Sequence, residues 1–120
     1  MALTLTRAQR GCLLANGRAG IAAAAAEAEH DPKPCIKIFT PDAGATWLLT
    51  EIDPEDQDRA FGLCDLGLGS PELGYVSLTE IASLKGRSGL PVEIDRHFQA
   101  QYPINHYAEI ARMAGRIITK

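Results

Sequence analysis

The residues best able to do chemistry in this chain are the carboxylates of its central part. Nine acidic residues and one arginine, Arg59, lie between positions 42 and 80, so this segment carries a net charge of −8 and the remainder +5, although the whole 120-residue chain totals only −3. Five of the acids are close together: Glu51, Asp53, Glu55, Asp56 and Asp58. Such a cluster attracts basic partners and repels DNA. The spacing predicts an acidic protein-binding surface that imitates phosphates, and a solvated loop is the simpler interpretation.

The same acids could instead bind a divalent cation. The stretch from Asp53 to Asp58 lacks the glycine and the final glutamate of an EF-hand loop. Asp42 followed by Glu51-Ile52-Asp53 is similar to the P-D…E-x-K pattern of magnesium-dependent nucleases, except that aspartate stands where lysine would support the attacking water. A small metal-dependent enzyme acting on nucleic acid or nucleotides is therefore the alternative hypothesis. It requires Asp42 and Glu51 to converge in one pocket. Our primary hypothesis needs no metal and no other cofactor.

The three histidines are weaker candidates for chemistry. His30, His97 and His106 are not spaced three or four residues from another histidine or cysteine, as a compact zinc site would require. His97 lies beside Asp95 and Arg96 and is the best placed of the three for a polar cluster. The sequence therefore predicts ordinary, partly exposed histidines.

The three cysteines, Cys12, Cys35 and Cys64, are widely spaced and odd in number. This pattern does not predict a disulfide framework, and the apolar neighbours of each cysteine indicate buried thiols. Free thiols fit a reducing cytoplasm, which is the location we expect. The N-terminal segment lacks the apolar core of a signal peptide, and no stretch of about 18 apolar residues could form a membrane span.

Two further sets of side chains have both a structural and a functional interpretation. Arginines in the first helical region could contact phosphates, but without interleaved aromatic residues they are more typical of a solvated helix surface; they are Arg7, Arg10 and Arg18. Aromatic residues of the central segment are typical of cross-strand or core packing, and an exposed docking face is the alternative; they are Trp47, Phe61 and Tyr75.

The elements that must position these residues begin with helix. Thr4 or Thr6 can cap a first helix, and Gly17 is a natural helix end. The alanine-rich segment 18–30 is either a second helix or a poorly anchored linker, because it has little apolar surface to bury. Proline residues at 32 and 34 end any helix there.

After Pro34 the pattern becomes that of strands. We expect strands over 35–39, 45–52, 60–66 and 73–76, with a polar loop at 53–58, and their short connections favour an antiparallel meander. Ser77 to Glu80 matches a capping box and should begin a helix. Residues 90–94 suit an edge strand and 105–114 a final helix that ends at Gly115.

The sequence thus predicts a single α+β domain with an antiparallel sheet of four to five strands flanked by two to four helices. We expect a helical N-terminal region at 1–34, a sheet-rich core with one short helix at 35–98, and a C-terminal helix within 99–120.

Three motifs occur in order along the central segment: T-W-L-L-T-E, A-F-G-L-C-D-L-G-L-G and E-L-G-Y-V-S-L. Through them, roughly residues 3–98 resemble the bacterial family named domain of unknown function 2958. The resemblance implies an accessory protein of plasmids, integrated elements and phage-like regions, and it supplies no known reaction. Members usually carry E-R-D after L-P-V, whereas here Ile94 separates Glu93 from Asp95. The role of that arginine has either moved to Arg96 or been lost.

These observations lead to one working hypothesis. We expect a non-enzymatic accessory protein of mobile elements that binds another protein, such as an anti-CRISPR or antirestriction inhibitor. Its acidic surface would cover a basic nucleic-acid site on a defence protein of the host. We do not expect direct nucleic-acid binding or membrane association, and homo-oligomerisation is left open.

Overall fold

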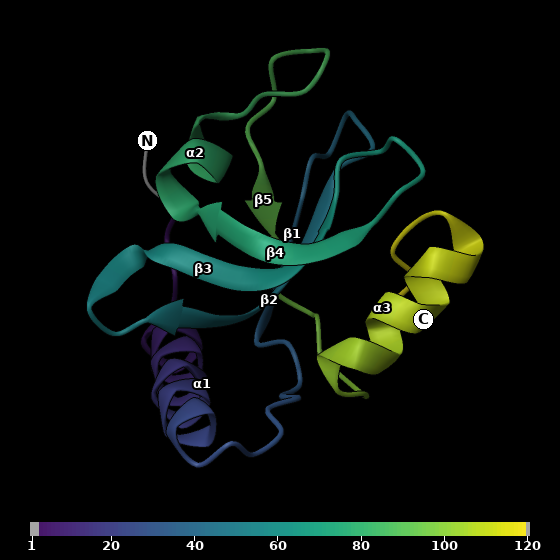
Figure 1. Ribbon diagram of the computed structural model, residues 1–120. Helices are drawn as coiled ribbons and strands as arrows, with labels where there is room; N and C mark the ends of the chain where they lie inside the picture. The colour runs from purple at the N-terminus through teal and green to yellow at the C-terminus, as the bar shows by residue number, and fades with distance from the viewer. Residues whose placement is uncertain (1–2, 120) are drawn as a thin grey trace.

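A five-stranded antiparallel sheet organises the chain, and the computed structural model describes residues 3–119 of it. The elements in chain order are α1 (Arg7–Ala25), β1 (Ile36–Phe39), β2 (Thr46–Asp53), β3 (Asp56–Asp65), β4 (Glu72–Ser77), α2 (Leu78–Ser83), β5 (Glu93–Ile94) and α3 (Ile104–Ala114) (Figure 1). The strand order is β4-β3-β2-β1-β5, so the first four strands form the predicted meander and β5 pairs with β1 at the edge. The predicted α+β fold is therefore confirmed.

Helix α1 is longer than the sequence suggested. Thr6 is its N-cap, and the side chains of Thr6 and Gln9 form a reciprocal capping box. The helix then continues through Gly17 to Ala25, so the prediction that Gly17 ends it was wrong. Gly17 is buried where α1 crosses β2, and a Cβ there would overlap the carbonyl oxygen of Ile52. This glycine is required by close helix–strand packing, and segment 18–30 is largely the second half of the same helix.

Apolar side chains pack on both faces of the sheet. On one face the core includes α1 and α2 residues and the strand residues Ile36, Ile38, Trp47, Leu49 and Ile52. On the other face α3 packs through Tyr107, Ala108 and Ala111 onto Leu48 and Leu63. The period of two along β2 produces this division, since Leu48 points opposite to Trp47 and Leu49.

The connection between β2 and β3 is a tight hairpin. Only Pro54 and Glu55 lie between the two strands, because β3 already begins at Asp56. The polar loop predicted over 53–58 was therefore wrong, and the acids of this stretch are carried on paired strands. By contrast, the Ser77 cap of α2 and the left-handed Gly115 after α3 (φ 76°) agree with the expectations.

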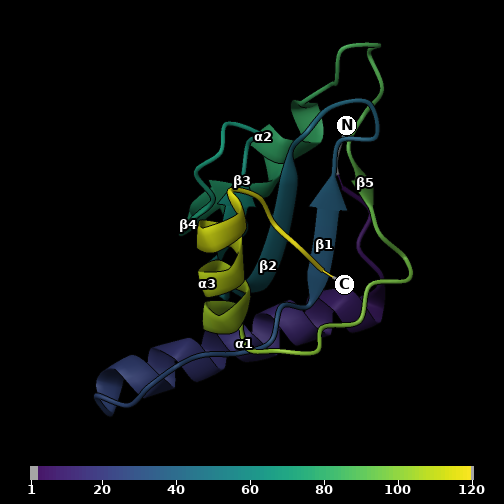
Figure 2. The ribbon, with the colours of Figure 1, turned by 90° about the vertical axis from the view of Figure 1, so that its right-hand side faces the viewer.

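The second half of α1 projects past the sheet on the side where α3 lies (Figure 2). The connection from Ala26 to Cys35 then runs back to β1. This return segment is held to the start of α3, since the carbonyl of Pro32 accepts the Ile104 N–H at 2.9 Å and Asp31 Oδ1 accepts the Asn105 N–H at 2.9 Å. Within residues 3–119 no helix is long and apolar enough to span a membrane.

Candidate functional site

A hollow of about 440 Å³ lies between the projecting half of α1 and the strands β2, β3 and β4. We call it the α1–sheet groove. Its lining combines small or apolar residues of α1 with charged and aromatic residues of the connection and the strands: Gly17, Gly20, Ile21, Ala24, His30, Glu51, Ile52, Asp53, Pro54, Arg59, Phe61 and Tyr75. This size suits a small molecule or a few side chains of a partner.

The groove opens on the sheet face that α3 covers only in part. Phe61 is two residues from Leu63 on β3, so both side chains point to this face. Leu63 is fully buried under α3, whereas Phe61 lies beyond the helix and pairs with Tyr75 on β4. The aromatic rings contact each other edge to face, with centroids 5.1 Å apart.

A β-bulge brings Glu51 into the groove. Leu49 is paired with Gly62 and Glu51 with Phe61, so Thr50 is the extra residue on β2. Without the bulge, Glu51 would follow Leu49 onto the apolar face packed by α1 and α2. The inserted Thr50 turns Glu51 to the side of Phe61, where a carboxylate can reach water and the groove.

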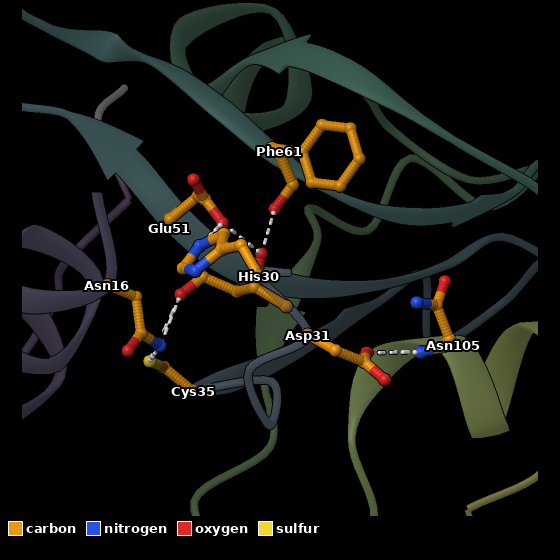
Figure 3. A network of polar contacts seen from close by, with 8 residues as sticks. Asn16, His30, Asp31, Cys35, Glu51, Phe61 and Asn105 are labelled. Atoms are coloured by element: carbon orange, nitrogen blue, oxygen red, sulfur yellow. Dashed lines mark hydrogen bonds and ion pairs between the residues drawn. The ribbon is translucent and has the colours of Figure 1, made fainter. Parts of the chain in front are cut away.

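Glu51 is paired there with His30, which comes from the connection after α1 (Figure 3). His30 Nε2 lies 3.0 Å from Glu51 Oε1, and the two side chains are only 24% and 19% exposed. Because an ionised carboxylate can only accept hydrogen bonds, Nε2 carries the hydrogen. Thr50 Oγ1 lies 3.1 Å from the same carboxylate oxygen and 3.2 Å from the Phe61 carbonyl, and its single proton can serve one of them at a time.

Glycine at position 20 makes room for this pair. A Cβ on Gly20 would lie 2.9 Å from both Glu51 Oε2 and His30 Nε2. The helix surface at Gly20 is therefore shaped around the carboxylate and the imidazole, and the pair lies between helix and sheet.

Arg59 and Tyr75 form the outer wall of the groove. The guanidinium carbon of Arg59 lies 4.0 Å from the Tyr75 ring centroid, which is a cation–π contact. Tyr75 is nevertheless 65% exposed, a large value for an aromatic residue on a strand. Of the three aromatic residues considered from the sequence, Trp47 is core at 2% exposure, and Tyr75 presents its ring to solvent.

The five acids predicted to bind a partner share one hairpin but face different surroundings. Glu51 is paired with His30, and Asp53 lines the groove while its Oδ1 accepts the Glu55 N–H at 2.9 Å. Glu55 and Asp56 are exposed at the hairpin tip. We call Asp53, Glu55 and Asp56 the hairpin-tip acids.

Asp58 points toward α2. Its Oδ1 accepts the backbone N–H and the hydroxyl of Thr79, at 2.8 Å and 2.6 Å, and its Oδ2 accepts the hydroxyl of Ser77. The hydrogen bond from Ser77, followed by those from Thr79, lowers the pKa of Asp58 below its ordinary value of 3.8. Asp58 thus has a structural role at the start of α2.

The remaining sequence candidates are dispersed. Asp42 Oδ2 accepts the Ser88 N–H, at the end of β2 opposite to Glu51, so the two acids do not converge in one pocket. His106 packs against Tyr102, with ring centroids 4.3 Å apart and the ring planes tilted by 49°. In the part of the chain that the structure describes, no group of three or more histidine, cysteine or acidic residues could hold a metal ion.

Two of the cysteines are joined. Cys12 of α1 and Cys35, just before β1, form a disulfide, so the expectation of buried free thiols was wrong for this pair. A separation of 23 residues concealed it, because only the return of the chain along α1 brings Cys35 to Cys12. Cys64 is the free thiol among the described residues, and partial burial raises its pKa to about 11.

For His30 and Tyr75 the sequence favoured a structural interpretation, and both line the groove. The charged residues beside His30 in sequence are Glu29 and Asp31. Its partner in the structure is Glu51, which is 21 residues away. One local feature of the sequence could have indicated the exposure of Tyr75. Side chains alternate along Glu72–Ser77, so Tyr75 and Val76 lie on opposite faces of the sheet.

Comparisons with known proteins give one result. No curated protein and no solved structure matches the chain. The family described as "Protein of unknown function (DUF2958)" matches residues 4–118, which include every strand, every helix and the whole α1–sheet groove. With nearly its full length matched, the chain belongs to the DUF2958 family.

Proposed function

We propose that this protein is a non-enzymatic accessory factor that binds another protein through the α1–sheet groove and the hairpin-tip acids. The observation that carries the proposal is the position of Tyr75. A ring that is 65% exposed lies beside a hollow whose floor holds a carboxylate and whose rim continues into an acidic hairpin. Exposed aromatic residues next to a pocket are typical anchors of protein interfaces.

The charges favour a basic segment as the occupant. Asp53, Glu55 and Asp56 form no salt bridge within residues 3–119, so their charges are available to a partner. The aliphatic part of a partner lysine or arginine could pack on Ile21 and Tyr75 while its charged end reaches Asp53. His30 lies deeper in the groove and Arg59 is exposed on its outer wall, so the acidic attraction is concentrated at the hairpin tip.

The family context supports a more specific version. The resemblance implies carriage on mobile elements, whose accessory proteins benefit from blocking host defences. A restriction or CRISPR protein presents lysine and arginine side chains where it holds nucleic acid. We propose that the hairpin-tip acids occupy such a basic surface and compete with phosphates there.

The test uses the full chain as tagged bait in extract of a host that carries active restriction and CRISPR systems. The variant Glu55→Lys/Asp56→Lys should lose a captured nucleic-acid-binding protein, and Tyr75→Ala should weaken the capture at least tenfold. The matched control Glu93→Lys/Glu109→Lys reverses the same number of exposed acids elsewhere and should retain the partner. A duplex DNA fragment added in excess should also displace the captured protein. Capture that survives the tip reversal would contradict the proposal.

A second candidate is a small metal-dependent enzyme acting on nucleic acid or nucleotides. Its predicted Asp42–Glu51 pair is not formed, so it is favoured only by the His30–Glu51 pair, whose side chains are both metal-ligand types and lie in a hollow. It predicts that Mn²⁺ or Mg²⁺ raises the melting temperature of the wild type and not that of His30→Ala. The protein-binding proposal predicts no such shift.

A further inference from the structure

We propose that Cys12 and Cys35 form a reversible thiol–disulfide switch that sets the shape of the α1–sheet groove through the connection carrying His30. The reactants would be low-molecular-weight thiols and disulfides, and the switch is independent of what occupies the groove. Residues 13–34, which include the projecting half of α1, lie inside the covalent loop that the disulfide closes. Oxidation would hold this loop against the sheet by a covalent bond, and reduction would leave it held by hydrogen bonds and packing alone.

The disulfide is accessible to small reagents. Cys12 is exposed on α1, and Cys35 is half-buried where the chain enters β1. A thiolate from solvent can therefore attack Cys12 Sγ, with Cys35 as the leaving group. Cys64 does not compete, since it lies partly buried in β3 and its thiol stays protonated near neutral pH.

The site around Cys35 fits both redox states. The side-chain amide of Asn16 donates to Cys35 Sγ at 3.4 Å and to the Thr50 carbonyl oxygen at 2.9 Å. In the dithiol form the new S–H of Cys35 has the same Thr50 carbonyl as acceptor, 3.4 Å away. Reduction therefore leaves the sulfur with both a donor and an acceptor, and the surrounding packing does not require a disulfide.

A short path connects this sulfur to the groove (Figure 3). Asn16 holds the backbone of the bulged Thr50, whose hydroxyl lies within hydrogen-bond distance of Glu51, and Glu51 is paired with His30. A second path runs along the chain from Cys35 through Pro34 and Pro32 to His30. Both paths end at the imidazole, so His30 is the residue that reports the redox state.

The exchange balances without any other reactant. In reduction, one thiolate of a dithiol attacks Cys12 Sγ, the bond between the two cysteines breaks, and Cys35 leaves as a thiolate that takes up a proton. The second thiolate of the reagent then attacks the mixed disulfide, which releases Cys12 and leaves the reagent oxidised to a disulfide. In oxidation by a glutathione-type disulfide, the two cysteines transfer two electrons and release two molecules of the small thiol.

The test uses the full chain with Cys64→Ser, so that only the pair can react. The protein is equilibrated in mixtures of reduced and oxidised glutathione and acid-quenched, and free thiols are then alkylated and counted by mass. We expect a single transition from no alkylation to two alkylations. Imidazole NMR signals recorded at both ends should show His30 shifted, while the indole signal of buried Trp47 stays unchanged. The variant Cys12→Ser/Cys35→Ser should give the NMR spectrum of the reduced protein, and the ratio of reduced to oxidised glutathione should not change that spectrum.

Three outcomes would overturn the proposal. The pair could remain as two thiols even in excess oxidised glutathione, which would mean that no switch exists. The His30 signals could be identical in both states, which would show that the disulfide does not affect the shape of the groove. Reduction could also unfold the whole chain, seen as loss of the dispersed Trp47 signal, and the disulfide would then be purely structural. None of these results depends on a binding partner, so they leave the proposed function to its own test.

Discussion

Asp58 Oδ1 accepts the backbone N–H of Thr79 at 2.8 Å, and this bond joins β3 to the first turn of α2. Helix α2 has only six residues, and Ser77 also accepts the Glu80 N–H at its start. Two side chains thus satisfy backbone N–H groups of the first turn, which have no acceptor within the helix.

We predict that Asp58→Ala lowers the urea midpoint of unfolding, whereas the exposed Glu55→Ala on the same hairpin leaves it nearly unchanged. The effect should depend on pH. The folded pKa of Asp58 lies below its ordinary value of 3.8, so the stabilisation is complete above that value and is lost as pH falls through the folded pKa. The difference between wild type and Asp58→Ala should therefore shrink in acid. A difference that grows on acidification would contradict this assignment.

A second prediction concerns the crossing of α1 over β2. Gly17→Ala should destabilise the protein by about 1–3 kcal/mol, because its methyl group would overlap the Ile52 carbonyl and force the helix away from the strand. Gly11→Ala is the matched control in the same helix, since nothing lies within 4 Å of a Cβ there. That variant should gain about 0.5–1 kcal/mol from helix propensity alone. Equal midpoints for the two variants in urea unfolding would refute the close packing at Gly17.

Gly20→Ala should behave differently from Gly17→Ala. Its methyl group would meet the ends of the Glu51 and His30 side chains, which can shift, and not a backbone oxygen. We expect stability within about 1 kcal/mol of wild type, because the gain in helix propensity offsets the displaced contact. The His30 imidazole signals should nevertheless move in NMR spectra. Unmoved signals would show that the pair is not held against α1.

Leu63 tests the contact between the sheet and α3. It is fully buried in the core under α3, so Leu63→Ala should cost about 2–5 kcal/mol. Leu73 of β4 is 37% exposed and serves as the control, with an expected cost of about 1 kcal/mol or less. Thermal unfolding of both variants beside wild type gives the comparison. A small effect at Leu63 would mean that α3 is not packed on the sheet as described.

Much of the fold was predictable because the signals are local. The alternation of apolar residues, the prolines at 32 and 34, and the Ser77 cap each act within a few residues, and the predicted meander and α2 followed from them. The continuation of α1 through Gly17 was not predictable, since a tertiary contact with Ile52 decides it.

The candidate site was less accessible to sequence reasoning. Strict alternation from Trp47 and Leu49 would place Glu51 in the apolar core, and only the bulge at Thr50 turns it into the groove. The partners His30 and Glu51, like Cys12 and Cys35, are more than 20 residues apart. Such pairs are formed by the path of the chain, which residue types and spacing do not encode. The five acids share one hairpin, but the surroundings of each depend on neighbours such as Ser77 and Thr79 that the sequence does not place beside them.

The disulfide also has a consequence for a cut chain. Cys12 precedes and Cys35 follows the projecting end of α1 and the whole return connection. If a protease nicks the backbone after Leu13 and before Cys35, the two fragments remain covalently attached, and the N-terminal piece keeps Leu13 within the core. On a gel the nicked oxidised protein would migrate as one band and separate into two only after reduction.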